Sequence, residues 1–264
     1  MSKDKRVKCF EVSLCNLTPL RIGGKDDLLS GRENSTVSFG SLPIVPGPSL
    51  KGALRATMER YLISKFYDAE KRKWKDGYEE LRPCIPNPKR SAEEEALVKA
   101  GRYRSATCAY SAQPGDRICP VCYLLGAQGL VGFVNVPFLV AESSQVQSLY
   151  SLRIDRGTGT GPARKGEGGN RPYEVVRPKV NFTGKLTVLM DDPARGWEFG
   201  KPRRLGDNIR PDEWLEKELW PDESLKGPDG LLNFLKQQLE SIDIIGGYKS
   251  KGCGRVKIEV SEVK

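Results

Sequence analysis

The sequence predicts an α+β fold in which four strands and two helices follow one another in the order β, α, β, β, α, β. Three observations support this prediction: short alternations of apolar and polar residues, two stretches with apolar residues at helical spacing, and long polar segments between them. This order is that of the ferredoxin-like (RRM-like) split βαβ arrangement, here with long insertions. We expect residues 1–264 to form one domain of this kind.

The first half of the chain supplies the first strand, the first helix and the second strand. Apolar and polar residues alternate over 6–15, which predicts a half-buried strand. A helix is expected over about 50–66, with Ser49 after Pro-Gly-Pro as its N-cap. The apolar run 130–142 predicts the second strand.

The second half repeats the pattern in the order strand, helix, strand. Residues 180–190 alternate cleanly and predict the third strand. Apolar residues lie on one side of a helix predicted over 229–243, which Gly246 and Gly247 are expected to stop. The alternation in RVKIEVSEV predicts the last strand at 255–263.

Charge and composition limit the classes of function. The chain has 43 Lys and Arg against 34 Asp and Glu, a formal charge of +9, which favours RNA or DNA as a partner. The alternative is a basic surface that only keeps the protein in solution. No long apolar window and no signal-peptide stretch follow the basic start, so we expect no membrane association and a cytoplasmic location.

The absence of histidine, with a count of 0, excludes His-based acid–base or nucleophilic catalysis. Any chemistry must therefore use carboxylates, Lys, Tyr, Ser, Cys or a metal ion.

Four cysteines fall in the charged, proline-rich stretch 67–129, which we predict to be a zinc-binding insertion. Cys119-Pro-Val-Cys122 is a CxxC pair, and Cys84 and Cys108 would complete four thiolates for a tetrahedral structural Zn²⁺. A closed site of this kind has no open position for catalysis. The alternatives are a redox pair or unconnected thiols.

Four segments are candidates for RNA binding. They are the stretch after the first strand, the helix entry PGPSLKG with its free N–H groups, the basic glycine-rich stretch 153–179, and the loop 246–255, whose glycines permit an anion nest. The alternatives are a capped helix with a solvated basic side, a flexible loop and a tight turn. The candidate residues are Arg21, Gly23, Gly24, Ser49, Lys51, Arg55, Arg156, Arg164, Lys165, Arg171, Tyr248, Lys249, Lys251 and Arg255.

Together these segments resemble the RAMP superfamily of CRISPR-associated proteins. GGYKSKGCGRV resembles its glycine-rich loop, LPIVPGPSLKGALR resembles the helix entry of type III backbone subunits, and IDRGTGTG followed by YEVV resembles their thumb hairpin, placed here in an insertion at 143–179. The likeness is to the Cas-seven-like family of type III-A or III-D complexes. It implies a subunit that binds guide RNA, helps to recognise complementary target RNA, and assembles with copies of itself or paralogues and with other effector subunits.

The resemblance also implies an aspartate, before the helix entry, that helps a divalent metal to cleave target RNA. In ENSTV this position is Asn34, and an amide cannot supply the charge that recruits Mg²⁺, which argues for weak or no cleavage. Glu33, Asp26 and Asp27 are the nearby acids that could replace it.

Three hypotheses follow. The first is a guide-RNA-binding backbone subunit, the second a metal-dependent endoribonuclease acting on target RNA, and the third a zinc-stapled RNA-binding or protein-interaction module outside CRISPR. Guide maturation remains open through Tyr248 and Lys249, although relatives in that class often rely on His.

Overall fold

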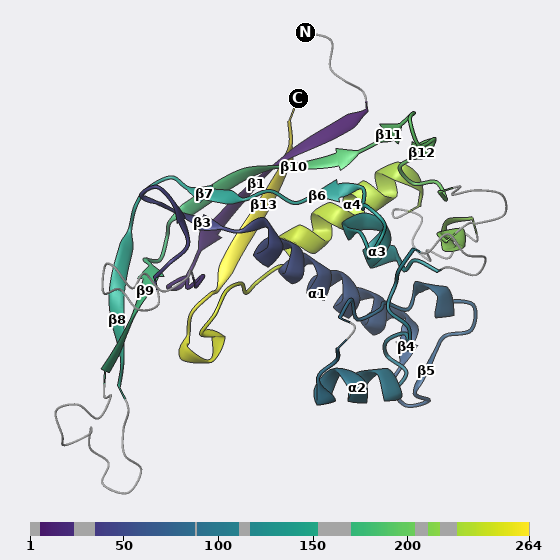
Figure 1. Cartoon of the computed structure of the whole chain (residues 1–264), viewed down its shortest axis with the longest axis horizontal. Coiled ribbons are helices and arrows are strands. Elements are labelled where there is room, and N and C mark those ends of the chain that lie inside the picture. Colours follow the sequence, from purple (N-terminus) through teal and green to yellow (C-terminus); the bar gives the residue numbers. More distant parts are fainter. Residues whose placement is uncertain are drawn as a thin grey trace, which may run out of the picture.

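The structure is a computed structural model, and its mixed helices and antiparallel strands confirm the α+β part of the predicted fold class (Figure 1). The main antiparallel sheet carries helices on one face, and a two-stranded ribbon extends from one end of this sheet (Figure 1). The described residues are 6–23, 35–87, 89–110, 117–152, 170–203, 211–216 and 226–263.

The main sheet has the strand order β13-β1-β10-β7-β3-β2, with β6 also paired to β10, and every pairing is antiparallel. The long strand β1 lies between the C-terminal strand β13 and β10. The strands are β1 (Val7–Asn16), β2 (Ser38–Phe39), β3 (Leu42–Val45), β6 (Val134–Asn135), β7 (Leu139–Ala141), β10 (Asn181–Leu189) and β13 (Val256–Glu262).

Three of the four predicted strands are confirmed as β1, β10 and β13, and their apolar positions are buried on one face. The run 130–142 forms two short strands, β6 and β7, rather than one. Pro137 lies in the break, and a proline has no N–H to give to a sheet ladder. The short strands β2 and β3 extend the sheet beyond the prediction.

Helices α1 (Gly47–Phe66) and α4 (Gly227–Glu240) cover one face of the sheet (Figure 1). The prediction of Ser49 as N-cap is wrong, because α1 begins at Gly47 with Pro46 as its cap. The Pro46 carbonyl accepts the N–H groups of Ser49 and Leu50 at 2.9 and 3.1 Å. Pro48 fits inside the first turn, where the missing N–H costs no hydrogen bond.

Helix α4 ends at Glu240, so the prediction that Gly246 and Gly247 stop it is wrong. The two glycines instead allow a close approach between distant segments. Gly246 has a φ of +87°, and a Cβ there would lie 2.3 Å from the Arg21 carbonyl oxygen. The Gly247 N–H donates to the same carbonyl at 2.8 Å.

The segment between α1 and β6 is more regular than the sequence indicated. Helix α2 starts with a capping box formed by Ser91 and Glu94, and buried residues of this segment, such as Trp74 and Leu81, join the same hydrophobic cluster as the sheet. The segment contains β4 (Tyr67–Asp68), β5 (Lys73–Trp74), the 3₁₀ turn η1 (Glu79–Leu81), α2 (Ala92–Lys99) and α3 (Pro120–Leu125).

Strands β8 (Val146–Leu152) and β9 (Asn170–Val176) pair with each other as the antiparallel ribbon seen in Figure 1. The connection to α4 contains β11 (Asp191–Asp192), β12 (Trp197–Glu198) and η2 (Glu213–Leu215), and the loop after α4 contains η4 (Lys249–Lys251). None of the helices in the described ranges combines the length and apolar character needed to cross a membrane.

Candidate metal centre and nucleic-acid interface

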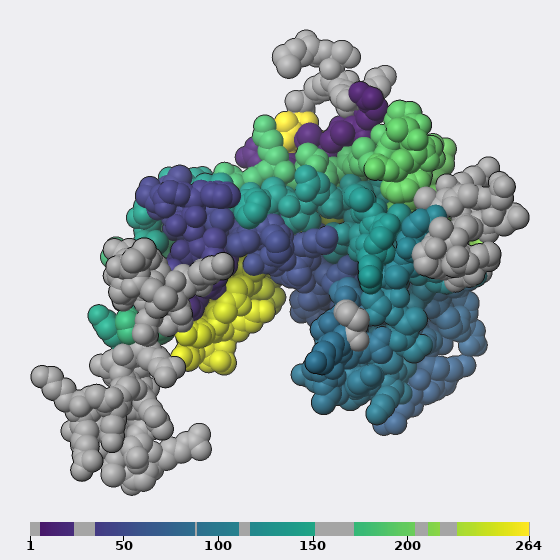
Figure 2. Space-filling view, viewed as in Figure 1, coloured from purple at the N-terminus to yellow at the C-terminus, as the bar shows by residue number. Residues whose placement is uncertain are grey.

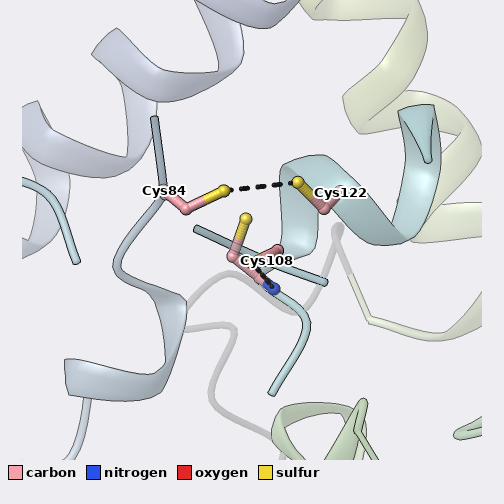
Figure 3. A group of neighbouring side chains, drawn as sticks. Cys84, Cys108 and Cys122 are labelled. Carbon is pink, nitrogen blue, oxygen red and sulfur yellow. Dashed lines mark hydrogen bonds between the residues drawn. The ribbon is translucent and has the colours of Figure 1, made fainter. Parts of the chain in front are cut away.

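The four predicted zinc ligands, Cys84, Cys108, Cys119 and Cys122, come together in one buried cluster. Their sulfur atoms all lie within 4.8 Å of one another, and the Sγ atoms of Cys84 and Cys122 are 3.5 Å apart (Figure 3). This separation is too long for a disulfide, which needs about 2.05 Å. Four thiolates at about 2.3 Å from a tetrahedral zinc lie about 3.8 Å from one another, so the cluster has suitable dimensions.

Backbone contacts bring Cys84 to Cys108 despite their separation in sequence. The Arg104 N–H donates to the Pro83 carbonyl at 2.9 Å, and the Thr107 hydroxyl donates to the Ile85 carbonyl at 3.1 Å. The stretches before Cys108 and around Cys84 therefore run side by side, which is a tertiary arrangement that sequence spacing does not reveal.

The CxxC pair is placed by helix α3. Cys119 is its N-cap, Pro120 occupies the first position, where proline is favoured, and Cys122 follows in the first turn. Both sulfurs thereby face the same side of the helix start.

Hydrogen-bond donors reach two sulfur atoms of the cluster. The Cys119 N–H donates to the Sγ of Cys108 at 3.3 Å, and the Arg55 guanidinium donates through both terminal nitrogens to the Sγ of Cys122 at 3.6 Å. Burial opposes ionisation of Cys119, but hydrogen bonds from the other three thiols outweigh it and hold the pKa of Cys119 well below its usual value, while hydrogen bonds within the cluster raise the pKa of Cys108 and of Cys122. Four buried, hydrogen-bonded sulfurs fit a structural Zn²⁺ and leave no open coordination position.

A groove of about 630 Å³ lies between α1 and the loop after α4, and we call it the small-residue groove. In Figure 2 the surface is hollowed between the yellow C-terminal segment and the blue insertion. The groove unites three of the four predicted RNA-binding segments, since the stretch after β1, the helix entry and the glycine loop all contribute. Its defining residues are Gly23, Ser49, Gly52, Ala56, Arg60 and Lys249.

Beside this groove, the ring of Tyr248 makes cation–π contacts with two of the predicted RNA-binding residues. The Arg21 guanidinium lies 4.8 Å, and the Lys251 ammonium 4.3 Å, from the centroid of the Tyr248 ring. Tyr173 of β9 contacts the same ring edge-to-face at 4.8 Å, and Arg21 also donates to the Glu174 carbonyl at 3.1 Å. The glycine loop, the stretch after β1 and the ribbon β8–β9 are thus joined at one point.

Lys51 and Arg55 lie on a different side of α1 from Ser49. They line a second groove of about 570 Å³, together with residues such as Gly126 and Asn135 that follow the CxxC pair. The Arg55 side chain is 13% exposed and forms an ion pair with Glu59 at 3.5 Å. The structure therefore divides the helix-entry residues between two grooves.

Arg255 is exposed immediately before β13, and its N–H donates to the Thr18 hydroxyl at 3.0 Å. Arg171 lies on the ribbon strand β9, and its side chain is not described. The remaining predicted site residues lie outside the described residues: Gly24, Asp26, Asp27, Glu33, Asn34, Arg156, Arg164 and Lys165.

Arg60, an exposed cation that lines the small-residue groove, is not among the residues predicted from the sequence. A usable signal was present, because Ser49, Gly52, Ala56 and Arg60 recur at helical spacing and mark a narrow face that ends in a cation. Tyr173 was also not named, although it lies within the YEVV motif.

Comparison with known families gives one match that covers most of the chain. The family model described as the RAMP superfamily matches residues 16–257, a range that includes both helices, the small-residue groove and the cysteine cluster. No curated protein matches the chain. The chain therefore belongs to the RAMP superfamily, and this membership indicates a CRISPR-associated role in RNA binding.

Proposed function

We propose that this chain is a guide-RNA-binding backbone subunit of a type III CRISPR interference complex and helps to recognise complementary target RNA. The observation that carries the proposal is the convergence of three sequence-predicted segments on the small-residue groove. The partners would be the guide RNA, its target, other effector subunits, and copies of this chain or paralogous backbone subunits.

The chemistry of the groove suits a phosphate backbone. Arg60 and Lys249 are exposed cations on the two sides of the groove. Gly23 and Gly52 have no side chains, so a phosphate backbone can come close to the protein backbone there. The first turn of α1 contains no acidic residue, so no negative charge there opposes a phosphate. Phosphate contacts of this kind give affinity without sequence preference, as a scaffold for guides of any sequence requires.

The parts of the fold can be assigned in line with the proposed function. The order β13-β1-β10-β7 places the fourth strand beside the first and the third strand between the first and the second, with α1 and α4 as the two crossover helices. We assign this arrangement to a ferredoxin-like core. Within it, 67–129 would be the zinc-binding subdomain, and the ribbon β8–β9 in 143–179 would be the thumb.

Target cleavage is not part of the proposal. Asn34 occupies the position at which the resemblance implies the metal-binding aspartate, and a neutral amide recruits Mg²⁺ poorly. The test is incubation of the assembled complex with matched target RNA and Mg²⁺. Regularly spaced cuts that disappear in Glu33→Ala would favour the endoribonuclease alternative and would assign Glu33 the role expected of Asn34.

The binding proposal is tested by titrating labelled repeat–spacer RNA at several salt concentrations. Phosphate-led binding weakens steeply with salt, and each lost contact to a single strand reduces the magnitude of the negative slope of log K against log [salt] by about 0.7. We expect this loss in Lys249→Ala and in Arg60→Ala, and no loss in the matched control Lys99→Ala, an exposed lysine on α2. A salt-independent affinity would favour the protein-interaction alternative.

A further inference from the structure

The side chain of Arg55 is committed to the cysteine cluster. Both of its terminal nitrogens lie 3.6 Å from the Sγ of Cys122, and one of them also reaches the Gly126 carbonyl at 3.5 Å. One helical turn further along α1, Glu59 forms an ion pair with Arg55 at 3.5 Å and accepts a hydrogen bond from the Tyr103 hydroxyl at 3.2 Å. The result is a continuous row of polar contacts from Cys122 of α3, through Arg55 and Glu59 of α1, to Tyr103.

The charge of a filled cluster explains this arrangement. Four thiolates around one Zn²⁺ carry a net charge of −2, and a buried charge is tolerated only when it is paired and hydrogen-bonded. Arg55 supplies a full positive charge against Cys122, while the Cys119 N–H supplies a neutral donor to Cys108. Arginine suits this position better than lysine, because its planar fork can donate to a sulfur and to a carbonyl at the same time.

We propose that Arg55 belongs to the metal centre rather than to the RNA interface, and that it links metal loading to the position of α1. Arg55 is a positioning residue: it neutralises the thiolates on one side of α1, and Gly52 and Ala56 line the small-residue groove on another side of the same turns. This assignment departs from the expectation, based on the RAMP resemblance, that Arg55 contacts RNA. It rests on zinc in the cysteine cluster and is independent of which RNA is bound.

The experiment separates the two roles by measuring zinc and RNA independently on the full chain. Zinc release to a chromogenic chelator is followed for wild type and Arg55→Gln, and RNA salt slopes are measured on fractions that hold one zinc per chain. We expect Arg55→Gln to weaken zinc retention about 10- to 100-fold, as loss of a residue hydrogen-bonded to a metal ligand does, and to keep the wild-type salt slope.

Arg60→Ala is the matched control, since Arg60 also lies on α1 but is exposed and lines the small-residue groove. We expect it to retain zinc as wild type does and to reduce the magnitude of the salt slope by about 0.7. If Arg55→Gln does not fold, Arg55→Lys, which keeps the charge but not the fork, should still show faster zinc release.

Wild-type zinc retention in both Arg55 variants, a lowered salt slope in zinc-loaded Arg55→Gln, or a wild-type protein without zinc would each overturn the assignment. A wild-type protein that binds no RNA would contradict the proposed function, while zinc release would still decide the role of Arg55.

Discussion

Two sides of helix α1 differ in how their polar residues are used. On one side the small residues Ser49, Gly52 and Ala56 line the small-residue groove, followed by the exposed Arg60. On the other side Arg55 and Glu59 are almost enclosed, and their charges are directed at each other and at the cysteine cluster. The difference teaches that a cation on a helix beside a candidate RNA groove is not by itself a candidate ligand for RNA, because its contacts with other residues decide its role.

The largest expected effect, on both zinc content and stability, is at the cysteine cluster beside Arg55. Cys119→Ser should remove about one zinc per chain and destabilise the protein by more than about 3 kcal/mol, because the free energy of binding structural zinc is folding free energy. Metal analysis and thermal unfolding measure both effects. Cys15→Ser, a half-buried thiol on β1, is the control. Unchanged zinc content in Cys119→Ser would show that the cluster does not hold the metal.

The next effect concerns Glu59, whose pKa burial raises from 4.5 to about 7, with partial compensation by Arg55. An acid with a raised pKa in the folded state contributes stability that is complete below pH 4.5 and is lost as the pH rises through about 7. Across this window the unfolding free energy of wild type should fall relative to Glu59→Gln by up to about 3 kcal/mol. Urea denaturation of both proteins at several pH values measures the difference, and parallel pH profiles would contradict it.

A smaller effect on the free energy of unfolding is expected at two glycines in the loop after α4. In Gly246→Ala the new methyl group would lie 2.3 Å from the Arg21 carbonyl oxygen, in a backbone conformation that glycine prefers, and we expect a loss above about 2 kcal/mol. Gly252→Ala shares a positive φ but has nothing within 4 Å, so about 1 kcal/mol is expected. Denaturant midpoints compare the two variants. Equal losses would mean that the close approach of Gly246 to Arg21 does not matter.

The smallest effect on stability is at Gly52, which is exposed within α1 and has open space where a Cβ would lie. Gly52→Ala should stabilise the helix by up to about 1 kcal/mol and leave RNA binding nearly unchanged. Gly52→Leu should keep most of the gain in stability but weaken RNA binding, because the larger side chain fills the small-residue groove. Wild-type RNA affinity in Gly52→Leu would place the RNA elsewhere.

Local patterns predicted the parts of this molecule that local interactions determine. The alternation of apolar and polar residues in β1, β10 and β13 reflects burial of one face of the sheet. The CxxC pair is local because both cysteines lie at the start of one short helix, α3. Helix limits were less accurate, because Pro46 and Pro48 moved the start of α1 ahead of Ser49.

The remaining features depend on tertiary contacts. The pairing of the stretches around Cys84 and Cys108, and the rotation of Arg55 toward sulfur rather than solvent, involve residues far apart in the chain. The sequence predicted the four clustered cysteines and three candidate RNA-binding segments that line one groove, but not the division of Lys51 and Ser49 between two grooves.

The closure of the glycine loop onto the stretch after β1 has a consequence for biosynthesis. The Gly254 N–H donates to the Pro19 carbonyl at 2.9 Å, and the Gly247 N–H donates to that of Arg21 at 2.8 Å. A growing chain therefore completes the wall of the groove only after its codons for this loop have been translated. Arg55 and all four cysteines leave the ribosome well before that point. In the order of translation, the four cysteines of the candidate metal centre therefore come before the loop that completes the small-residue groove.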